Sequence, residues 1–310
     1  TYESLCQQDC KDFIWLIVDD GSTDETADLV KGWQKEKNGF EIQYIYKENG
    51  GMHTAHNAAY EHIKTELNMC IDSDDCVAKG AIGKILDKWE TIKDDDYAGI
   101  IGLDADSDDK MAPGSVGKIK CAWENVRKKD YAGLIALDAD FSGTIIGKGF
   151  PDGMKDTTLG GYYAAGGSGD KKLIYRTDVI NSVPPYPVFN GEKYVGLVYK
   201  YTLVDQKYKL FVLNEVVCEV EYQEDGSTST MWKQYLKNPQ GFAFLRKIAM
   251  KYPISKKRLI RDCIHYCSSS QIAGNKKYIQ ESPRKMLTLF CTPLGWGLTK
   301  IIKKKVKEMS

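Results

Sequence analysis

The chain has 310 residues, enough for one large domain or two modest ones with a sizeable core. Hydrophobic residues make up 42% and charged residues 28%, which is typical of a soluble globular protein and argues against a disordered chain. No run of about 18 uncharged apolar residues indicates a membrane-spanning helix, and we recognise no signal peptide. The nine cysteines show no zinc-ligand spacing, so we expect reduced thiols in a cytosolic protein.

The formal net charge of zero conceals an uneven distribution. From residue 246 onward there are 16 Lys/Arg and 3 Asp/Glu, which indicates an anionic partner for this end of the chain. Within 283–307, aliphatic residues and Trp296 accompany a lysine cluster, as in helices that lie on an anionic membrane. The alternative is a helix packed on the protein with a solvated basic end. No RNA- or DNA-binding motif accompanies these lysines, so we expect no nucleic-acid partner.

The first part of the chain predicts an α/β domain. We expect strands at 13–18, 42–46 and 67–71, with helices at 25–35 and 54–64 between them. Strands that alternate with helices are typical of a mainly parallel sheet flanked by helices. In such sheets ligands bind beyond the carboxyl ends of the strands.

Carboxylates follow two of the predicted strands. Asp19 and Asp20 end the first, and Asp72 and Asp74 follow the third. Acids crowded at the end of a buried strand repel one another unless a cation lies between them, and carboxylate oxygens suit Mg²⁺ or Mn²⁺. An isolated D-x-D is also compatible with a solvated turn that caps the next helix. Both clusters lie at carboxyl ends of strands, so we expect one site that contains both.

Three segments together resemble family 2 glycosyltransferases of the GT-A fold, in order and in spacing. They are IVDDGSTDET at 17–26, NGGMHTAHN at 49–57 and CIDSDD at 70–75. The similarity is greatest to bacterial members that build surface polysaccharides, and it continues through FNGEKYVG at 189–196 to cover nearly the whole chain. Members of this family have a strand and most of a helix ahead of the first motif, whereas this chain enters at the end of that helix. We therefore expect a strand edge that lacks its neighbour.

The resemblance implies a GT-A fold, with a mainly parallel, mixed sheet flanked by helices, and roles for individual residues. Asp74, assisted by Asp72, would bind Mn²⁺ or Mg²⁺ and so neutralise the diphosphate of a nucleotide-sugar donor. Asp20 would hold the base of a uridine-like nucleotide, and Asp19 would orient the turn. Three further residues complete the expected donor site: Lys47 near a phosphate, and His53 and Asn57, either as ligand contacts or as structural hydrogen-bond partners.

A tandem repeat follows the third motif. Residues 72–105 and 106–139 align without a gap and share 19 identical positions. The DSDD at 72–75 recurs at 106–109, so the chain has two candidates for the metal site. We expect the first copy to be used because its spacing from the preceding helix matches the family. A third echo, Leu137-Asp138-Ala139-Asp140, closes the second copy.

In the second half we expect strands at 171–175 and 210–220, the latter as a strand pair, followed by helix from 232 to 265. At the point where the family carries an acidic motif, this chain has Glu192 followed by Lys193. By resemblance Glu192 is the candidate base that deprotonates the acceptor hydroxyl; the alternative is a solvated glutamate at a helix start. We expect a glycosyltransferase domain over 1–230 and a helical, basic region over 231–310.

The leading hypothesis is an inverting, metal-dependent transfer of a sugar from a UDP-linked donor to a polysaccharide or lipid-linked glycan. The expected location is the cytoplasmic face of the membrane. The alternatives are a nucleotidyltransferase, which also uses paired aspartates on an α/β sheet, and a catalytically inactive subunit that binds sugar nucleotides.

Overall fold

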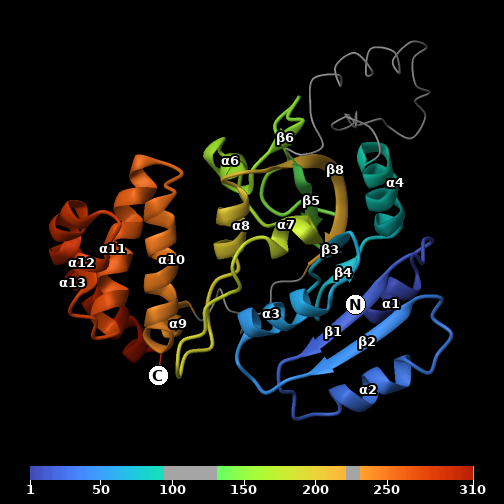
Figure 1. Ribbon diagram of the computed structural model, residues 1–310, viewed down its shortest axis with the longest axis horizontal. Helices are drawn as coiled ribbons and strands as arrows, with labels where there is room; N and C mark the ends of the chain where they lie inside the picture. The colour runs from blue at the N-terminus through green and yellow to red at the C-terminus, as the bar shows by residue number, and fades with distance from the viewer. Residues whose placement is uncertain (94–130, 221–230, 310) are drawn as a thin grey trace.

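The computed structural model describes residues 1–93, 131–220 and 231–309 (Figure 1). The N-terminal part is a two-stranded parallel sheet with short helices beside it. Its elements are α1 (Tyr2–Cys6), β1 (Ile14–Asp19), α2 (Thr26–Trp33), β2 (Glu41–Tyr46) and α3 (Met52–His62). Among the strands that the structure describes, β1 pairs only with β2.

A six-stranded sheet forms the centre of the molecule, with the order β3-β7-β5-β8-β4 and β6 paired to β8. Its strands are β3 (Leu67–Met69), β4 (Cys76–Val77), β5 (Tyr131–Ala139), β6 (Asp156–Thr157), β7 (Lys171–Arg176) and β8 (Lys209–Glu219). The helices between them are α4 (Ala81–Lys93), α6 (Leu159–Ala164), α7 (Thr177–Asn181) and α8 (Val198–Val204).

The predicted α/β class with a mixed sheet is confirmed, although antiparallel pairings outnumber parallel ones among the described strands. β1–β2 and β5–β8 are parallel, whereas β3–β7, β5–β7, β4–β8 and β6–β8 are antiparallel. The prediction relied on the strand–helix alternation of the first 75 residues, and the later strands do not follow it. Residues 210–220 form one strand rather than a pair, with a register irregularity where Leu213 and Val216 face Ala136 and Leu137.

The central strand β5 carries apolar side chains to both faces of the sheet, and all nine of its residues are buried. Leu134 and Ala136 pack with Trp89 of α4 on one face, whereas Ala132 and Ile135 pack on the α7–α8 side. Full burial of one Leu or Ile side chain contributes about 1.5–3 kcal/mol. β5 therefore fixes the position of the strand ends on which the candidate site depends.

Helices α9 (Met231–Lys237), α10 (Pro239–Lys251), α11 (Lys256–Ile272), α12 (Tyr278–Glu281) and α13 (Lys285–Glu308) form the C-terminal part (Figure 1). The helix expected over 232–265 is three helices, because Pro239 starts α10 and Pro253 follows its end. α13 packs closely on α11, since a Cβ at Gly295 would lie 2.4 Å from the Cβ of Cys267. None of the helices in the described part combines the length and apolar character needed to cross a membrane.

The repeat contributes to this fold from both copies. The first copy supplies α4, and the second supplies β5. The second DSDD, at 106–109, lies outside the described residues. The eight cysteines that the structure describes are free thiols.

Candidate active site

The first two motifs meet at the carboxyl ends of the parallel strands β1 and β2. Asp20, directly after β1, accepts hydrogen bonds from the amides of Gly50 (3.0 Å) and Gly51 (2.7 Å) and pairs with the ammonium of Lys47. Burial opposes ionisation of Asp20, but these bonds outweigh it and hold the pKa of the carboxyl below its ordinary value. Asp20 thus fixes the turn that leads into α3.

Asp19 orients the turn after β1, as its position in the motif suggested. One carboxylate oxygen accepts from the amide of Ser22 (2.7 Å) and the other from the hydroxyl of Tyr44 (2.6 Å) on β2. The side chain is 5% exposed. Both carboxylate oxygens are therefore engaged in hydrogen bonds within the protein.

Lys47 was expected to approach a phosphate, and the structure gives it other partners. Besides Asp20, its ammonium donates to the hydroxyl of Thr54 (2.8 Å) and to the carbonyl of Glu48 (2.7 Å). Only 22% of the side chain is exposed. An incoming phosphate would have to compete with Asp20 for this cation.

Helix α3 carries three polar residues of the second motif on its inner side. His53 is 1% exposed, and neither ring nitrogen has a hydrogen-bond partner among the described residues. Burial lowers the pKa of His56 to about 4, so this ring is neutral near pH 7. Asn57 makes two reciprocal hydrogen bonds of 2.9 Å with the backbone of Tyr186, which ties α3 to the segment before Glu192. Asn57 is therefore a structural partner here.

The third motif forms an exposed turn after β3. The hydroxyl of Thr1 lies 2.9 Å from the carbonyl of Ser73 and 2.7 Å from that of Asp75, and the amide of Asp75 donates to the carbonyl of Asp72. Asp72 and Asp74 are exposed, and neither carboxylate forms an ion pair with a described residue. Their hard oxygen atoms are suited to Mg²⁺ or Mn²⁺.

The described residues contain no group of three or more His, Cys, Asp or Glu side chains placed to hold a metal. Mg²⁺ usually binds through one or two carboxylates and substrate phosphates rather than through an all-protein cage. Asp72 and Asp74 fit that mode, in which the donor's diphosphate supplies the remaining ligands.

A buried charge cluster beneath this turn was not predicted from the sequence. Asp75 is 3.5 Å from the ammonium of Lys172 on β7, and only 9% and 13% of the two side chains are exposed. Burial raises the pKa of Asp138 at the end of β5 to about 6. Burial disfavours the ammonium of Lys172, but Asp138, Cys218 and Asp75 outweigh it and raise its pKa. The sequence pointed to this cluster only through Asp138, which lies in the third echo of the repeat.

Glu192 lies at the start of α10 and is 8% exposed. Its carboxylate accepts from the amides of Gln240 (2.9 Å) and Gly241 (2.8 Å), which are unpaired donors of the first helical turn. Glu192 thus caps α10 in this structure, whereas the sequence prediction considered it as the catalytic base or as a solvated glutamate. The solvated alternative is wrong.

The loop that contains Glu192 also contacts the turn at 49–51, which we call the donor turn. A Cβ at Gly51 would lie 2.0 Å from the carbonyl oxygen of Lys193, so the two backbones touch. Asp20, the turn at 49–51 and the loop that contains Glu192 therefore form one continuous contact. This contact joins the first two motifs to the FNGEKYVG segment at 189–196.

Residues 1–142 match the family model described as glycosyl transferase family 2. This match covers less than half of the chain, and over these residues the chain resembles family 2 glycosyltransferases. A curated relative, the teichoic acid poly(glycerol phosphate) polymerase of Staphylococcus epidermidis, is 38% identical over 92 residues, which are 28% of this chain and 12% of that protein. The undecaprenyl-phosphate 4-deoxy-4-formamido-L-arabinose transferase of an Enterobacter species is 32% identical over 71 residues, 23% of this chain and 22% of that protein.

The fold of the chain is similar to solved structures. S. aureus TarS 1-349 in complex with UDP-GlcNAc superposes with a TM-score of 0.52 at 14% identity, over 99% of this chain and 87% of that one. A second S. aureus TarS structure gives 0.51 at 14% identity, over 98% of this chain and 51% of that one. At this identity the similarity establishes the GT-A-like fold alone. The chain spans less than a quarter of the curated relatives that it matches.

Proposed function

We propose that the chain transfers a sugar from a UDP-linked donor to a hydroxyl group of a polysaccharide or lipid-linked glycan. The observation that carries this proposal is the contact between Gly51 and the carbonyl of Lys193, where the first two motifs meet the segment at 189–196 beside the ends of β1 and β2. The exposed carboxylates of Asp72 and Asp74, which form no ion pair with a described residue, support a site for a metal-bound diphosphate. A bound Mg²⁺ or Mn²⁺ would offset the negative charge that the leaving diphosphate develops.

The chain's own residues have separable tasks in this proposal. Asp20 holds the turn at 49–51 and so presents the start of α3 to the nucleotide; Asp72 and Asp74 hold the metal. Glu192 is the proposed base, because each of its oxygens accepts one amide hydrogen and has a further lone pair for an acceptor hydroxyl. Attack from the side opposite the leaving diphosphate gives inversion at the anomeric carbon.

Turnover separates this proposal from its two alternatives. With Mn²⁺ and a panel of UDP-sugars, we expect slow release of UDP by donor hydrolysis when no acceptor is present. Adding an acceptor should make UDP release faster. An inactive sugar-nucleotide-binding subunit would bind UDP and release none from any donor. A nucleotidyltransferase would instead release pyrophosphate from UTP and a sugar phosphate. Release of UDP together with free or transferred sugar supports the proposal, and either other pattern contradicts it.

We also propose that α13 rests on an anionic membrane at the cytoplasmic face. Its buried side faces α11, whereas more than half of each large apolar side chain on the opposite side is exposed. These side chains are Met286, Leu289, Phe290, Leu294, Trp296 and Ile301. Exposed lysines follow in the last two turns, at 300, 303, 304, 305 and 307. Apolar side chains beside lysines match the two phases of a lipid headgroup region.

Vesicle sedimentation tests the membrane proposal. The protein should bind vesicles that contain phosphatidylserine, bind those of phosphatidylcholine alone much more weakly, and lose affinity as salt is added. Phe290→Ser should reduce binding about tenfold, because one inserted aromatic side chain is lost. Leu29→Ser, at an exposed position on α2, is the matched control and should have no effect. Equal binding by both variants would exclude α13 as the contact.

A further inference from the structure

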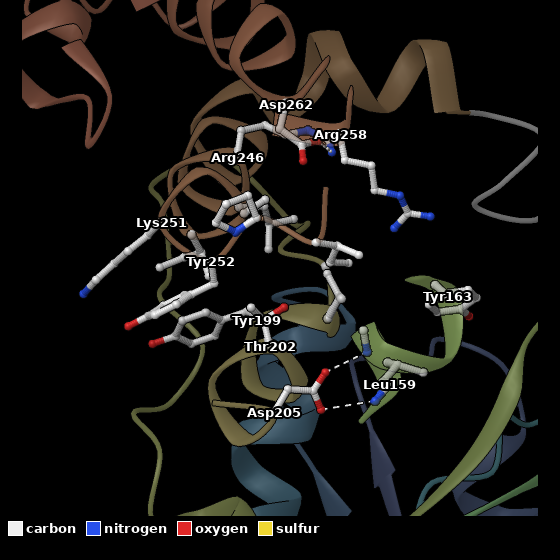
Figure 2. Close-up of a pocket in the computed structure, with 18 of the residues that line it drawn as sticks. Leu159, Tyr163, Tyr199, Thr202, Asp205, Arg246, Lys251, Tyr252, Arg258 and Asp262 are labelled. Atoms are coloured by element: carbon white, nitrogen blue, oxygen red, sulfur yellow. Dashed lines mark hydrogen bonds and ion pairs between the residues drawn. The ribbon is translucent and has the colours of Figure 1, made fainter. Parts of the chain in front are cut away.

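A large cavity in the described part of the molecule lies away from the donor motifs. It has a volume of about 710 Å³ and is bounded by α6 and α8 on one side and by α10 and the start of α11 on the other (Figure 2). This volume lies within the range of small-molecule sites, roughly 300–1,000 Å³. None of Asp19, Asp20, Asp72 or Asp74 lines it.

The carboxylates in its wall are already satisfied. Asp262 forms an ion pair with Arg246 at 2.7 Å, and Asp205 accepts from the amides of Leu159 (3.3 Å) and Gly160 (2.8 Å) (Figure 2). Burial raises the pKa of Asp205 to about 6. Neither acid is therefore free to attract a cation into the cleft.

Three cations in the wall have no such compensation. Lys251, Arg258 and Arg261 line the cleft, and none forms an ion pair with a carboxylate in the described ranges. The guanidinium of Arg258 lies 5.8 Å from the ring centre of Tyr163, and the ammonium of Lys251 lies 5.2 Å from that of Tyr252. Figure 2 shows these two pairs at opposite sides of the cleft.

Tyrosines add further polar surface to the cleft. Five tyrosines line the cleft: Tyr163, Tyr194, Tyr199, Tyr235 and Tyr252. A tyrosine offers an apolar ring face and a hydroxyl group, which together suit a hydroxyl-rich carbon chain. Arginine binds phosphate and carboxylate groups through two parallel hydrogen bonds. The wall thus combines sites for hydroxyl groups with sites for separated negative charges.

One loop separates the cleft from the donor side. The carbonyl of Lys193 contacts Gly51 of the donor turn, whereas the next residue, Tyr194, lines the cleft and stacks on Phe242 at 4.9 Å. Gly196, two residues later, also lines it. A chain held in the cleft would therefore lie on the far side of this loop from the donor turn.

We propose that this cleft binds an anionic, hydroxyl-rich chain, with phosphodiester or carboxylate groups at Arg258 and Lys251 and hydroxyl groups at the tyrosines. Identifying this chain as the acceptor rests on the proposed function; the binding itself does not. The bound chain is either a polyol phosphate or a uronate polysaccharide, since both carry separated negative charges and many hydroxyl groups.

Fluorescence polarisation with three labelled probes tests the proposal on the full chain. The probes are a glycerol phosphate oligomer, a hyaluronan oligosaccharide and a neutral dextran oligosaccharide. One or both anionic probes should bind and the dextran should not. Arg258→Gln should weaken binding about tenfold, the size of one charge-assisted contact, and Arg258→Lys should restore part of it. Lys257→Gln, the adjacent exposed position on α11, is the control and should change binding less than about twofold.

UDP binding measured on the same samples separates this inference from the proposed function. UDP binding that is unchanged in Arg258→Gln, with the probe lost, supports a cleft distinct from the donor site. Probe binding without any UDP binding supports the cleft and contradicts the proposed function. Dextran binding as tight as that of the anionic probes, or Arg258→Gln binding them like the unmodified protein, overturns the inference. So does competition between UDP and the probe for a single site.

Discussion

Replacing Gly51 by alanine is expected to destabilise the protein strongly and to abolish donor binding. Gly51 has φ 94° and ψ 156°, a region that residues with a Cβ rarely adopt. The added Cβ would also meet the carbonyl oxygen of Lys193 at 2.0 Å. Strain and overpacking together should cost roughly 2–6 kcal/mol. The turn must then move, and its amides leave Asp20.

Gly143→Ala is the matched control for this prediction. Gly143 also has a positive φ, 84°, but a Cβ there would have no atom within 4 Å. The control therefore reports backbone strain alone, about 1–3 kcal/mol. The free energy of unfolding in urea should fall further for Gly51→Ala than for Gly143→Ala. Equal losses would mean that the contact between the donor turn and the Glu192 loop does not form.

Replacing Lys172 by methionine should be the second large effect. Lys172 is the cation between buried Asp75 and Asp138, and removal of one partner of a buried pair typically costs about 3–5 kcal/mol. The side-chain volume is nearly retained, so the loss reports charge rather than packing. Because Asp75 closes the turn that contains Asp72 and Asp74, donor binding should weaken as well.

The pH dependence distinguishes this mechanism from a packing defect. Without Lys172, the buried carboxylates should have higher pKa values in the folded protein, so they take up protons on folding and stability falls as pH rises through those values. The pKa of Asp138 is already about 6 with the lysine present. The deficit should therefore be smaller near pH 5 than near pH 8. Lys207→Met, at an exposed position after α8, should show no deficit at either pH; a pH-independent deficit in Lys172→Met would indicate packing instead.

Local patterns were sufficient for the first part of the fold. The strand at 13–18, the turn at 49–51 and the helix at 54–64 could be predicted, because apolar periodicity and the preference of glycine for turns are properties of a few neighbouring residues. The turn role of Asp19 follows equally from short-range geometry, since its partner Ser22 is three residues away. Which strands run antiparallel could not be predicted, because this depends on how β7 and β8 pair with β5 across long separations.

The partners of the site residues could not be predicted either, because they are far apart in the sequence. Glu192 caps a helix that starts 47 residues later, and Lys172 meets Asp75 across 97 residues. No local pattern marks either pair. The choice between the two DSDD copies rests on spacing alone, because the second copy lies outside the described residues.

Calorimetric titration with UDP, in the presence and absence of Mn²⁺, tests the central claim most directly. Three proteins are compared: the unmodified chain, Asp74→Asn and Asp108→Asn. The account predicts binding that requires Mn²⁺, is weakened roughly tenfold or more in Asp74→Asn, and is unchanged in Asp108→Asn. Mn²⁺-independent binding, or loss in Asp108→Asn with Asp74→Asn unaffected, would contradict a metal-dependent donor site at the turn after β3.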